Sequence, residues 1–203
     1  MRGRFITLDG SEGVGKSTQM ALIADWLATR GIAAHFTREP GGTALGETLR
    51  ALLLDPATHA DAYTELLVIL AARNEHLVQE IRPRLACGQW VICDRYNDAT
   101  YAYQGAARGI PAASIAAFEA LLPAHLEPDL RLILGLSPEE SARRIATRGN
   151  AHDRFEQEDA PFFDAVRDAY RARAQLANAR FIDASGSPEA VFSHIAQALA
   201  ELE

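Results

Sequence analysis

Short apolar runs alternate along the chain with longer stretches in which apolar residues recur at helical spacing. The apolar runs cover residues 5–9, 33–37, 90–94, 130–136 and 180–183, and each has the length of a single strand. The stretches with helical spacing cover about residues 17–30, 44–54, 62–87, 111–122, 138–147, 159–177 and 188–202. This alternation predicts an α/β protein with three α/β/α layers, in which helices cover both faces of a five-stranded parallel sheet.

Charged side chains gather where the predicted strands end. Asp9 closes the first run, Arg38 follows the second, and Asp94 and Arg95 end the third. Parallel strands bring their carboxyl ends to one edge of the sheet, where ligands bind in folds of this class. The pattern therefore predicts a charged binding site at that edge.

A glycine-rich segment joins the first predicted strand to the first predicted helix. It matches the pattern G-x-x-x-x-G-K-[ST], and its strand-to-helix context is that of a phosphate-binding loop (P-loop). In such a loop, backbone N–H groups face phosphate oxygens, the lysine reaches the β- and γ-phosphates, and the serine hydroxyl binds Mg²⁺. The alternative is a glycine turn without a ligand. The predicted ATP-binding residues are Gly10, Ser11, Glu12, Gly13, Val14, Gly15, Lys16, Ser17 and Thr18.

Lys16 is the single lysine among 20 basic side chains, and all the others are arginines. Lysine is a compact point charge on a flexible stem, whereas arginine is a wide planar fork. A loop wrapped closely around a triphosphate has room for the first and not for the second. The lone lysine therefore favours a ligand-binding loop over a plain turn.

Composition narrows the class of protein further. A chain of 203 residues with 48% hydrophobic residues predicts one domain, and a net charge of −7 argues against a nucleic-acid-binding surface as its main function. No apolar run approaches the roughly 18 residues that span a membrane, and no signal peptide is visible. We expect Cys87 and Cys93 to be free thiols. A cytoplasmic enzyme fits these features.

Two segments at the strand ends suggest further roles. Asp94 ends an apolar strand and is a candidate Mg²⁺ ligand, although it could instead cap the following helix. Arg95 follows it and suits a second anionic ligand, because its guanidinium grips phosphate with two bonds. Arg38 opens a Pro- and Gly-rich turn that presents it at the same edge, although a surface position is the alternative.

A group of arginines surrounds the loop near Gly149. Arg143, Arg144, Arg148 and Arg154 could form a closing lid over about residues 143–156 that brings positive charge to a transferring phosphoryl group. Arg144 and Arg148 lie four positions apart on one predicted helical face, whereas Arg143 is expected to face solvent. The alternative is a charged helix exposed to water.

The chain resembles the bacterial thymidylate kinases over essentially its whole length. The glycine-rich loop by itself identifies only a nucleotide-binding site. The more specific segments are Arg-Glu-Pro-Gly-Gly-Thr at 38–43 and Ala-Tyr-Gln-Gly at 102–105, in this order and spacing. Further matches are Ala-Ala-Arg at 71–73, Asp-Arg-Tyr at 94–96 and Asp-Arg-Phe-Glu at 153–156.

The resemblance implies ATP- and Mg²⁺-dependent phosphorylation of dTMP to dTDP, usually by a homodimer. It implies that Glu12 contacts the sugar 3′-OH, that Arg38 and Arg95 hold the acceptor phosphate, and that a lid rather than the loop supplies the catalytic arginine. The remaining implied substrate-binding residues surround the base: Ile69, Arg73, Thr100, Tyr103 and Gln104. The implied catalytic side chains are Lys16, Arg95, Arg148 and Arg154, with Ser17 and Asp94 at the metal.

Three positions depart from the usual pattern of that family. Ile69 stands where an aromatic residue usually stacks on thymine, Ala99 replaces a frequent serine, and Asp9 stands where glutamate is common. Loss of a π-face at position 69 removes part of the stacking energy, on the order of 1 kcal/mol. These departures bear on acceptor selectivity more than on the type of reaction.

Three other functions compete with this interpretation. A kinase for another nucleoside monophosphate or for a metabolite hydroxyl would share the loop and the fold. A GTP-dependent switch would need an Asn-Lys-x-Asp segment, which a chain with one lysine at position 16 lacks. The size and acidic charge of the chain oppose a P-loop motor or a DNA-associated ATPase.

Overall fold

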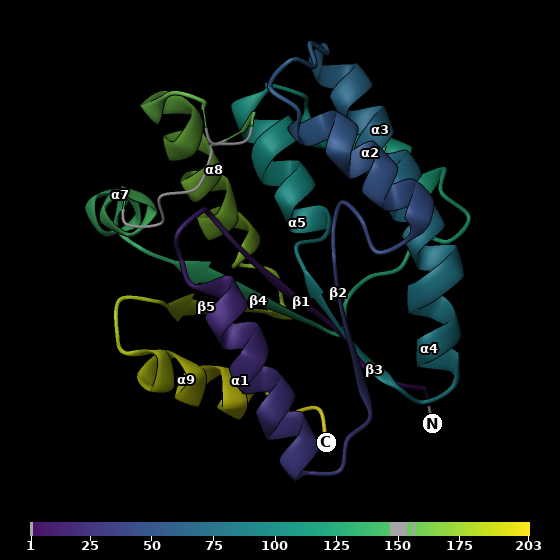
Figure 1. The fold of residues 1–203 in the computed structure, drawn as a ribbon, viewed down its shortest axis with the longest axis vertical. Coiled ribbons are helices and arrows are strands. Elements are labelled where there is room, and N and C mark those ends of the chain that lie inside the picture. The colour runs from purple at the N-terminus through teal and green to yellow at the C-terminus, as the bar shows by residue number, and fades with distance from the viewer. Residues whose placement is uncertain (1, 147–153, 156) are drawn as a thin grey trace.

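The computed structural model describes residues 2–146, 154–155 and 157–203, and its fold is drawn in Figure 1. One sheet contains five parallel strands, in the order β2-β3-β1-β4-β5. The strands are β1 (Phe5–Gly10), β2 (Ala34–Arg38), β3 (Trp90–Asp94), β4 (Leu130–Gly135) and β5 (Ala179–Asp183). The predicted five-stranded parallel sheet is confirmed, and β1 with the loop that follows it lies at the centre.

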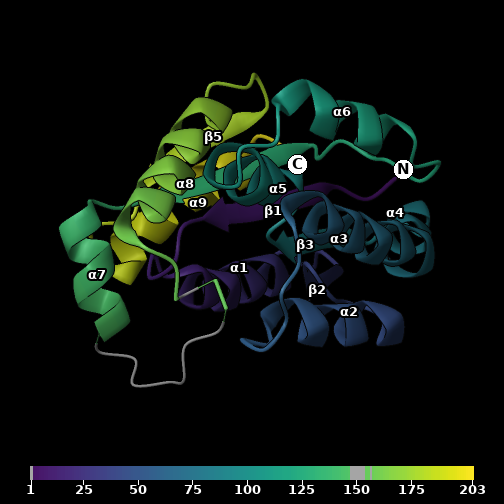
Figure 2. The ribbon, with the colours of Figure 1, turned by 90° about the horizontal axis from the view of Figure 1, so that it is seen from above.

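Helices cover both faces of the sheet, because alternate side chains of each strand point to opposite sides. Ile6 and Leu8 of β1 pack against α1 (Lys16–Thr29) and α9 (Pro188–Ala200), whereas Phe5 packs on the other face. Figure 2 shows α1 and α8 (Ala160–Arg173) on opposite sides of β1. The three-layer α/β/α arrangement is therefore confirmed.

The helical stretch predicted at residues 62–87 is one continuous rod with three parts. It consists of α3 (Ala62–His76), a π-helical segment (Leu77–Ile81) and α4 (Arg82–Ala86), and α2 (Ala44–Leu54) packs on α3. The π-helical segment ends two residues before Pro83, which has no N–H and whose ring crowds the carbonyl one turn earlier. The rod carries Ile69 and Arg73 to the edge of the sheet where ligands are expected.

A helical segment that the sequence pattern did not predict follows β3. Here α5 (Asn97–Thr100) continues into a π-helical segment (Tyr101–Ala107), and α6 (Ala112–Ala120) comes next. The sequence pattern names no element at residues 97–107, and the structure adds one there. The segment is packed against protein on several sides, so its buried residues show no amphipathic spacing. Short π-helical segments occur frequently at functional sites.

The predicted lid begins within α7 (Pro138–Ala146). Most of the remaining lid residues, Arg148 among them, lie outside the described part of the chain, whereas Arg154 and Phe155 lie within it. Cys87 and Cys93 are free thiols, as expected. Within the described residues, no helix combines the length and the apolar character needed to cross a membrane.

Candidate active site

The glycine-rich segment wraps around the side chain of Lys16 at the end of β1. Gly10 adopts a φ of 138°, and a Cβ built on it would lie 2.4 Å from the carbonyl oxygen of Leu134 on the neighbouring strand, so no larger residue fits. The Lys16 Nζ donates to the carbonyl oxygens of Gly10 at 3.2 Å and Ser11 at 3.1 Å. Burial, and next the nearby Arg95, lower the pKa of Lys16. An anion in the loop would relieve this cost by giving the ammonium group a partner.

Ser17 and Asp94 line one shallow hollow beside the loop. Ser17 belongs to the first turn of α1, and Asp94 ends β3, which pairs with β1. The Asp94 Oδ1 is buried without a hydrogen-bond partner among the described residues, and the residue that caps α5 is Tyr96, not Asp94. A hydroxyl and an unpartnered carboxylate oxygen are ligands that suit Mg²⁺. The donor set therefore fits the implied metal, and the capping alternative is not what the structure has.

Arg95 lies between the phosphate loop and the neighbouring cavity that it lines. Its φ of 67° is left-handed, a conformation that costs a non-glycine residue about 1–3 kcal/mol. The guanidinium donates to the Gly10 carbonyl at 2.8 Å and to the Tyr170 hydroxyl at 2.9 Å, and it forms an ion pair with Glu12. The strained backbone thus directs this side chain across the end of the loop, where it can meet two anionic ligands.

Asp9 is completely buried behind the same group of side chains. The Tyr170 hydroxyl donates to its Oδ1 at 3.4 Å, and its Oδ2 has no partner among the described residues. Burial, followed by the negative charge of Asp98, raises the pKa of Asp9 from its ordinary 3.8 to about 7. The site therefore contains a carboxyl group that titrates near neutrality.

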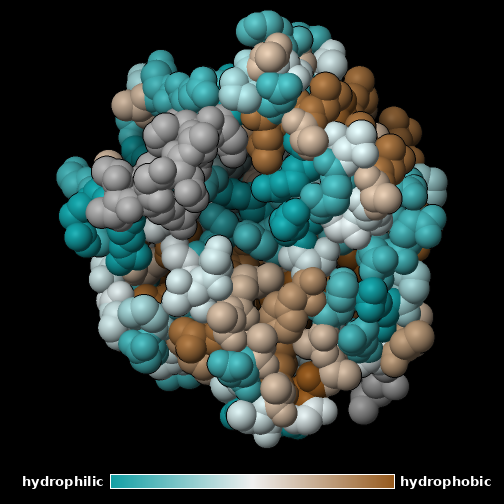
Figure 3. All heavy atoms as spheres, in the orientation of Figure 1, coloured by the Kyte–Doolittle hydropathy of each residue, from teal (hydrophilic) through white to brown (hydrophobic). Residues whose placement is uncertain are grey.

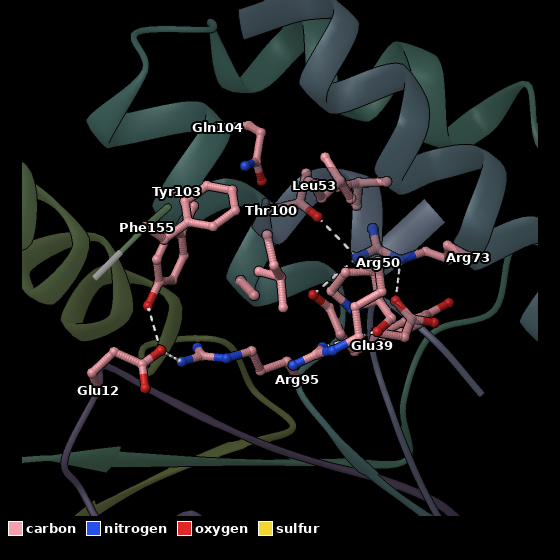
Figure 4. Close-up of a pocket in the computed structure, with 15 residues that line it drawn as sticks. Glu12, Glu39, Arg50, Leu53, Arg73, Arg95, Thr100, Tyr103, Gln104 and Phe155 are labelled. Carbon is pink, nitrogen blue, oxygen red and sulfur yellow. Dashed lines mark hydrogen bonds and ion pairs between the residues drawn. The ribbon is translucent and has the colours of Figure 1, made fainter. Parts of the chain in front are cut away.

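A cavity of about 620 Å³, counting the space at its mouth, opens next to Arg95. Figure 4 shows Phe155 and Tyr103 on one side of it, Leu53 and Arg73 on the other, and Glu12 and Arg95 along its lower edge. The Tyr103 hydroxyl donates to Glu12 at 3.4 Å. Glu12 lies within the phosphate loop and also lines the cavity, so the loop and the cavity border each other at this residue. The predicted residues brought to this cavity are Glu12, Ile69, Arg73, Arg95, Thr100, Tyr103 and Gln104.

Arg73 is held from several directions. Its Nε donates to Glu39 at 2.7 Å, its Nη1 donates to Glu119 at 3.2 Å, and its Nη2 donates to the Thr100 hydroxyl at 2.9 Å. Although burial opposes ionisation of Glu39, the charge of Arg73 holds the pKa of that carboxyl below its ordinary value. His76 contacts Glu39 as well, at 3.1 Å. The guanidinium is thereby fixed in one plane at the cavity wall.

Gln104 and Arg154 meet at a common carboxylate. Glu65 is fully buried, and its two oxygens accept from Gln104 Nε2 and from Arg154 Nη2, each at 2.6 Å. Arg154 is not among the described residues that line the cavity, and its described side-chain hydrogen bonds run to α2 and α3, not to the phosphate loop. Arg143 is 69% exposed and paired with Glu140, which agrees with its expected position facing solvent.

The remaining predicted residue, Arg38, lies outside the cavity. Its side chain is 53% exposed, pairs with Glu47 at 2.9 Å, and lines the hollow that contains Ser17 and Asp94. A different basic residue, Arg50, lines the cavity and donates to the Pro40 carbonyl at 3.0 Å.

Sequence reasoning missed several cavity residues on α2 and near the lid. The missed residues include Arg50, Leu53, Leu54 and Phe155. One signal was present, because Arg50, Leu53 and Leu54 share a helical face with the buried Gly46. A charged residue on the inward face of a helix indicates a ligand or an internal partner.

Comparisons with known proteins agree with this architecture. A model of the thymidylate kinase family matches residues 8–195. The thymidylate kinase of Chromohalobacter salexigens is 54% identical, over 98% of this chain and 96% of that protein. The thymidylate kinase of Dichelobacter nodosus is 52% identical, over 96% of both chains.

A solved structure gives the same result at the level of the fold. The crystal structure of thymidylate kinase from Ehrlichia chaffeensis superposes with a TM-score of 0.79 at 30% identity, and covers 98% of this chain and 100% of that one. The chain therefore belongs to the thymidylate kinase family.

Proposed function

We propose that this chain carries out the reaction of its family, the ATP- and Mg²⁺-dependent phosphorylation of dTMP to dTDP, where the phosphate loop meets the adjacent cavity. The observation that carries the proposal is the position of Glu12, which belongs to the loop and lines the cavity. A donor phosphate in the loop and an acceptor in the cavity would meet at Glu12, next to Arg95. Direct in-line transfer requires such an arrangement.

The donor is bound by the loop and by Lys16. The ammonium group leaves the carbonyl oxygens that it contacts here and neutralises the β- and γ-phosphates, while the loop N–H groups bind phosphate oxygens. Ser17 and Asp94 hold Mg²⁺, either directly or through water. When bound, the ion offsets negative charge on the transferring phosphoryl group.

The acceptor occupies the cavity with its phosphate toward Arg95. Arg95 binds that phosphate and offsets its repulsion by the donor, Arg38 adds charge from the neighbouring hollow, and Glu12 accepts a hydrogen bond from the sugar hydroxyl. The base lies deeper, among Ile69, Arg73, Thr100, Tyr103 and Gln104. The acceptor phosphate is already ionised at neutral pH, so no strong general base is required.

The lid arginines complete the proposed charge around the phosphoryl group. Arg148 and Arg154 are the candidates, and Arg148 lies outside the described residues. Arg154 is bonded to Glu65, so it acts at the phosphoryl group only after that bond breaks. We assign the larger part of the lid charge to Arg148 for this reason.

We also propose that the enzyme is a cytoplasmic homodimer. Tyr63, Leu67 and Val78 are exposed by 45%, 51% and 46% along one side of the long helical rod. Figure 3 shows hydrophobic residues gathered over α2 and α3 in the upper right of the view. A second copy of the chain would cover them, because exposed apolar patches of soluble proteins often mark interaction surfaces.

The test is ADP production from ATP and Mg²⁺ with dTMP, dUMP, UMP, CMP, GMP or AMP as the single acceptor. Strong preference for dTMP is expected. Preference for another monophosphate would support the proposed type of reaction but would show that the base pocket is assigned to the wrong base. Binding of ATP without acceptor-dependent turnover would overturn the proposed activity.

A further inference from the structure

Phe155 reaches the cavity from the predicted lid segment, whereas the other apolar lining comes from the body of the protein. Leu53 and Leu54 belong to α2 and Ile69 belongs to α3. The Phe155 ring meets the Tyr103 ring edge to face, with centroids 5.8 Å apart and planes at 88°. Phe155 is partly buried and belongs to the lining of the cavity.

The residue before it is fastened to the end of α2. The Arg154 backbone N–H donates to the Leu54 carbonyl at 3.1 Å, and its Nε donates to the Leu53 carbonyl at 2.9 Å. The guanidinium carbon lies 4.7 Å from the centroid of the Phe155 ring. Because Arg154 is held in this way, the position of the next residue, Phe155, is fixed as well.

The anchor depends on the charge of Glu65. This carboxylate is fully buried and needs a cation, which Arg154 supplies at 2.6 Å, while Arg108 lies farther away at 3.6 Å. The other oxygen of Glu65 holds the amide of Gln104, whose side chain lines the cavity near Phe155 (Figure 4). One buried carboxylate thus sets the positions of a polar group and of an aromatic ring at the same end of the cavity.

We propose that Phe155 is a specificity-determining residue whose ring contacts the planar base of the acceptor nucleotide, and that Glu65 positions it by holding Arg154. This inference rests on the proposed function, in which the cavity takes the acceptor. The aliphatic side chain of Ile69 offers the base no π-face, whereas an aromatic ring from the lid side does. Recognition of the base would then depend on the position in which Phe155 is held.

The first experiment replaces Phe155 by leucine, which keeps an apolar side chain and removes the ring. The KM for dTMP is expected to rise about fivefold, the scale of a lost base–aromatic contact, while kcat falls by a smaller factor. Inhibition by deoxyribose 5-phosphate, which has no base, should not weaken. Phe163→Leu is the matched control, since Phe163 packs on Phe162 and does not line the cavity.

A rescue experiment separates contact with the base from a purely structural role. Adding Ile69→Phe to Phe155→Leu returns an aromatic face to another wall of the cavity, and the KM for dTMP should recover at least in part. Equal weakening of dTMP and deoxyribose 5-phosphate, with no rescue, would overturn the proposal. Wild-type enzyme that turns over no acceptor would instead refute the proposed function.

The role of Glu65 is tested by Glu65→Gln, which keeps a hydrogen-bonding side chain for Gln104 and removes the charge that holds Arg154. The KM for dTMP should rise in this variant. In the Phe155→Leu background, Glu65→Gln should raise the KM little further, because both substitutions remove the same contact between the Phe155 ring and the base. Circular dichroism checks that each variant is folded. Fully additive effects in folded variants would contradict positioning through Arg154.

Discussion

Arg95 is the residue on which the two halves of the candidate site depend. Its left-handed backbone places one guanidinium against the Gly10 carbonyl, the Glu12 carboxylate and the Tyr170 hydroxyl. Lys16 lies at the centre of the loop and donates to the carbonyl oxygens of Gly10 and Ser11. One proposed catalytic cation therefore lies within the loop and the other lies across its end, where each could offset charge on a transferring phosphoryl group.

Replacing either cation should impair catalysis strongly. Lys16→Ala or Arg95→Ala is expected to lower kcat for dTMP phosphorylation by at least about a hundredfold, the scale on which a lost charge donor acts. Arg143→Ala is the control, because that side chain is 69% exposed and contacts Glu140. The measurement is steady-state kinetics. Wild-type turnover in the Lys16→Ala and Arg95→Ala variants would refute the catalytic roles of these two residues. An equal loss of kcat in Arg143→Ala would mean that Arg143 faces the site.

Asp9 should make the stability of the metal-free protein depend on pH. Its pKa is raised to about 7 in the folded protein from an ordinary 3.8, so the folded state binds more protons than the unfolded chain. The contribution of Asp9 to stability is then fully present below about pH 4 and is lost as the pH rises through about 7, by up to roughly 4 kcal/mol. Asp9→Asn should flatten this decline.

The measurement is urea unfolding at about pH 5 and pH 8 with a chelator present. Asp25→Asn, on the exposed side of α1, serves as the matched control and should follow the wild type. If the Asp9 variant loses as much stability between the two pH values as the wild type does, the raised pKa is not the cause.

At the scale of elements, the sequence predicted what local patterns determine. The strands follow from short apolar runs, and the phosphate loop follows from a motif whose residues lie close together in the sequence, so both were found. The segment after β3 was missed because buried Asp98 looks like a loop residue until its partners are known. Those partners are Arg131 at 2.9 Å and Arg173 at 2.5 Å, from β4 and α8.

The residues of the cavity likewise divide into those that local sequence patterns indicate and those that they do not. Patterns along the chain indicated the residues at the strand ends, whereas Arg73, Thr100, Tyr103 and Gln104 came from resemblance to a family. No local signal places Phe155 beside Tyr103, since about 50 residues separate them and the contact exists only after the segment docks on α2. Long-range contacts of this kind are what a single sequence does not reveal.

Arg73 links several elements and should be an important source of stability. It ties α3 to Glu39 after β2, to Thr100 of α5 and to Glu119 of α6. Removing one member of a buried ionic network leaves the other charges without partners, at a cost of about 3–5 kcal/mol. Arg73→Leu should therefore lower the free energy of unfolding by about that amount, as measured by chemical denaturation.

A second arginine provides the control for this prediction. Arg171 is 60% exposed and pairs with Asp168 at 3.3 Å, so Arg171→Leu should cost no more than about 1 kcal/mol. Similar losses in both variants would indicate that the buried network is not what stabilises these elements. Arg73→Leu should also weaken dTMP binding, since the guanidinium lines the cavity.

At the scale of the whole molecule, the proposed homodimer would bury the exposed apolar side of the helical rod. Leu67 lies at its centre, 51% exposed between Tyr63 and Val78, and a charge placed there would be buried against a second copy of the chain. Leu67→Glu should therefore convert the homodimer to a monomer in sedimentation velocity experiments. Leu176→Glu, at a residue 37% exposed next to β5, should leave the dimer intact. A wild-type protein that sediments as a monomer, or a Leu67→Glu variant that remains a dimer, would show that the proposed surface is not the interface.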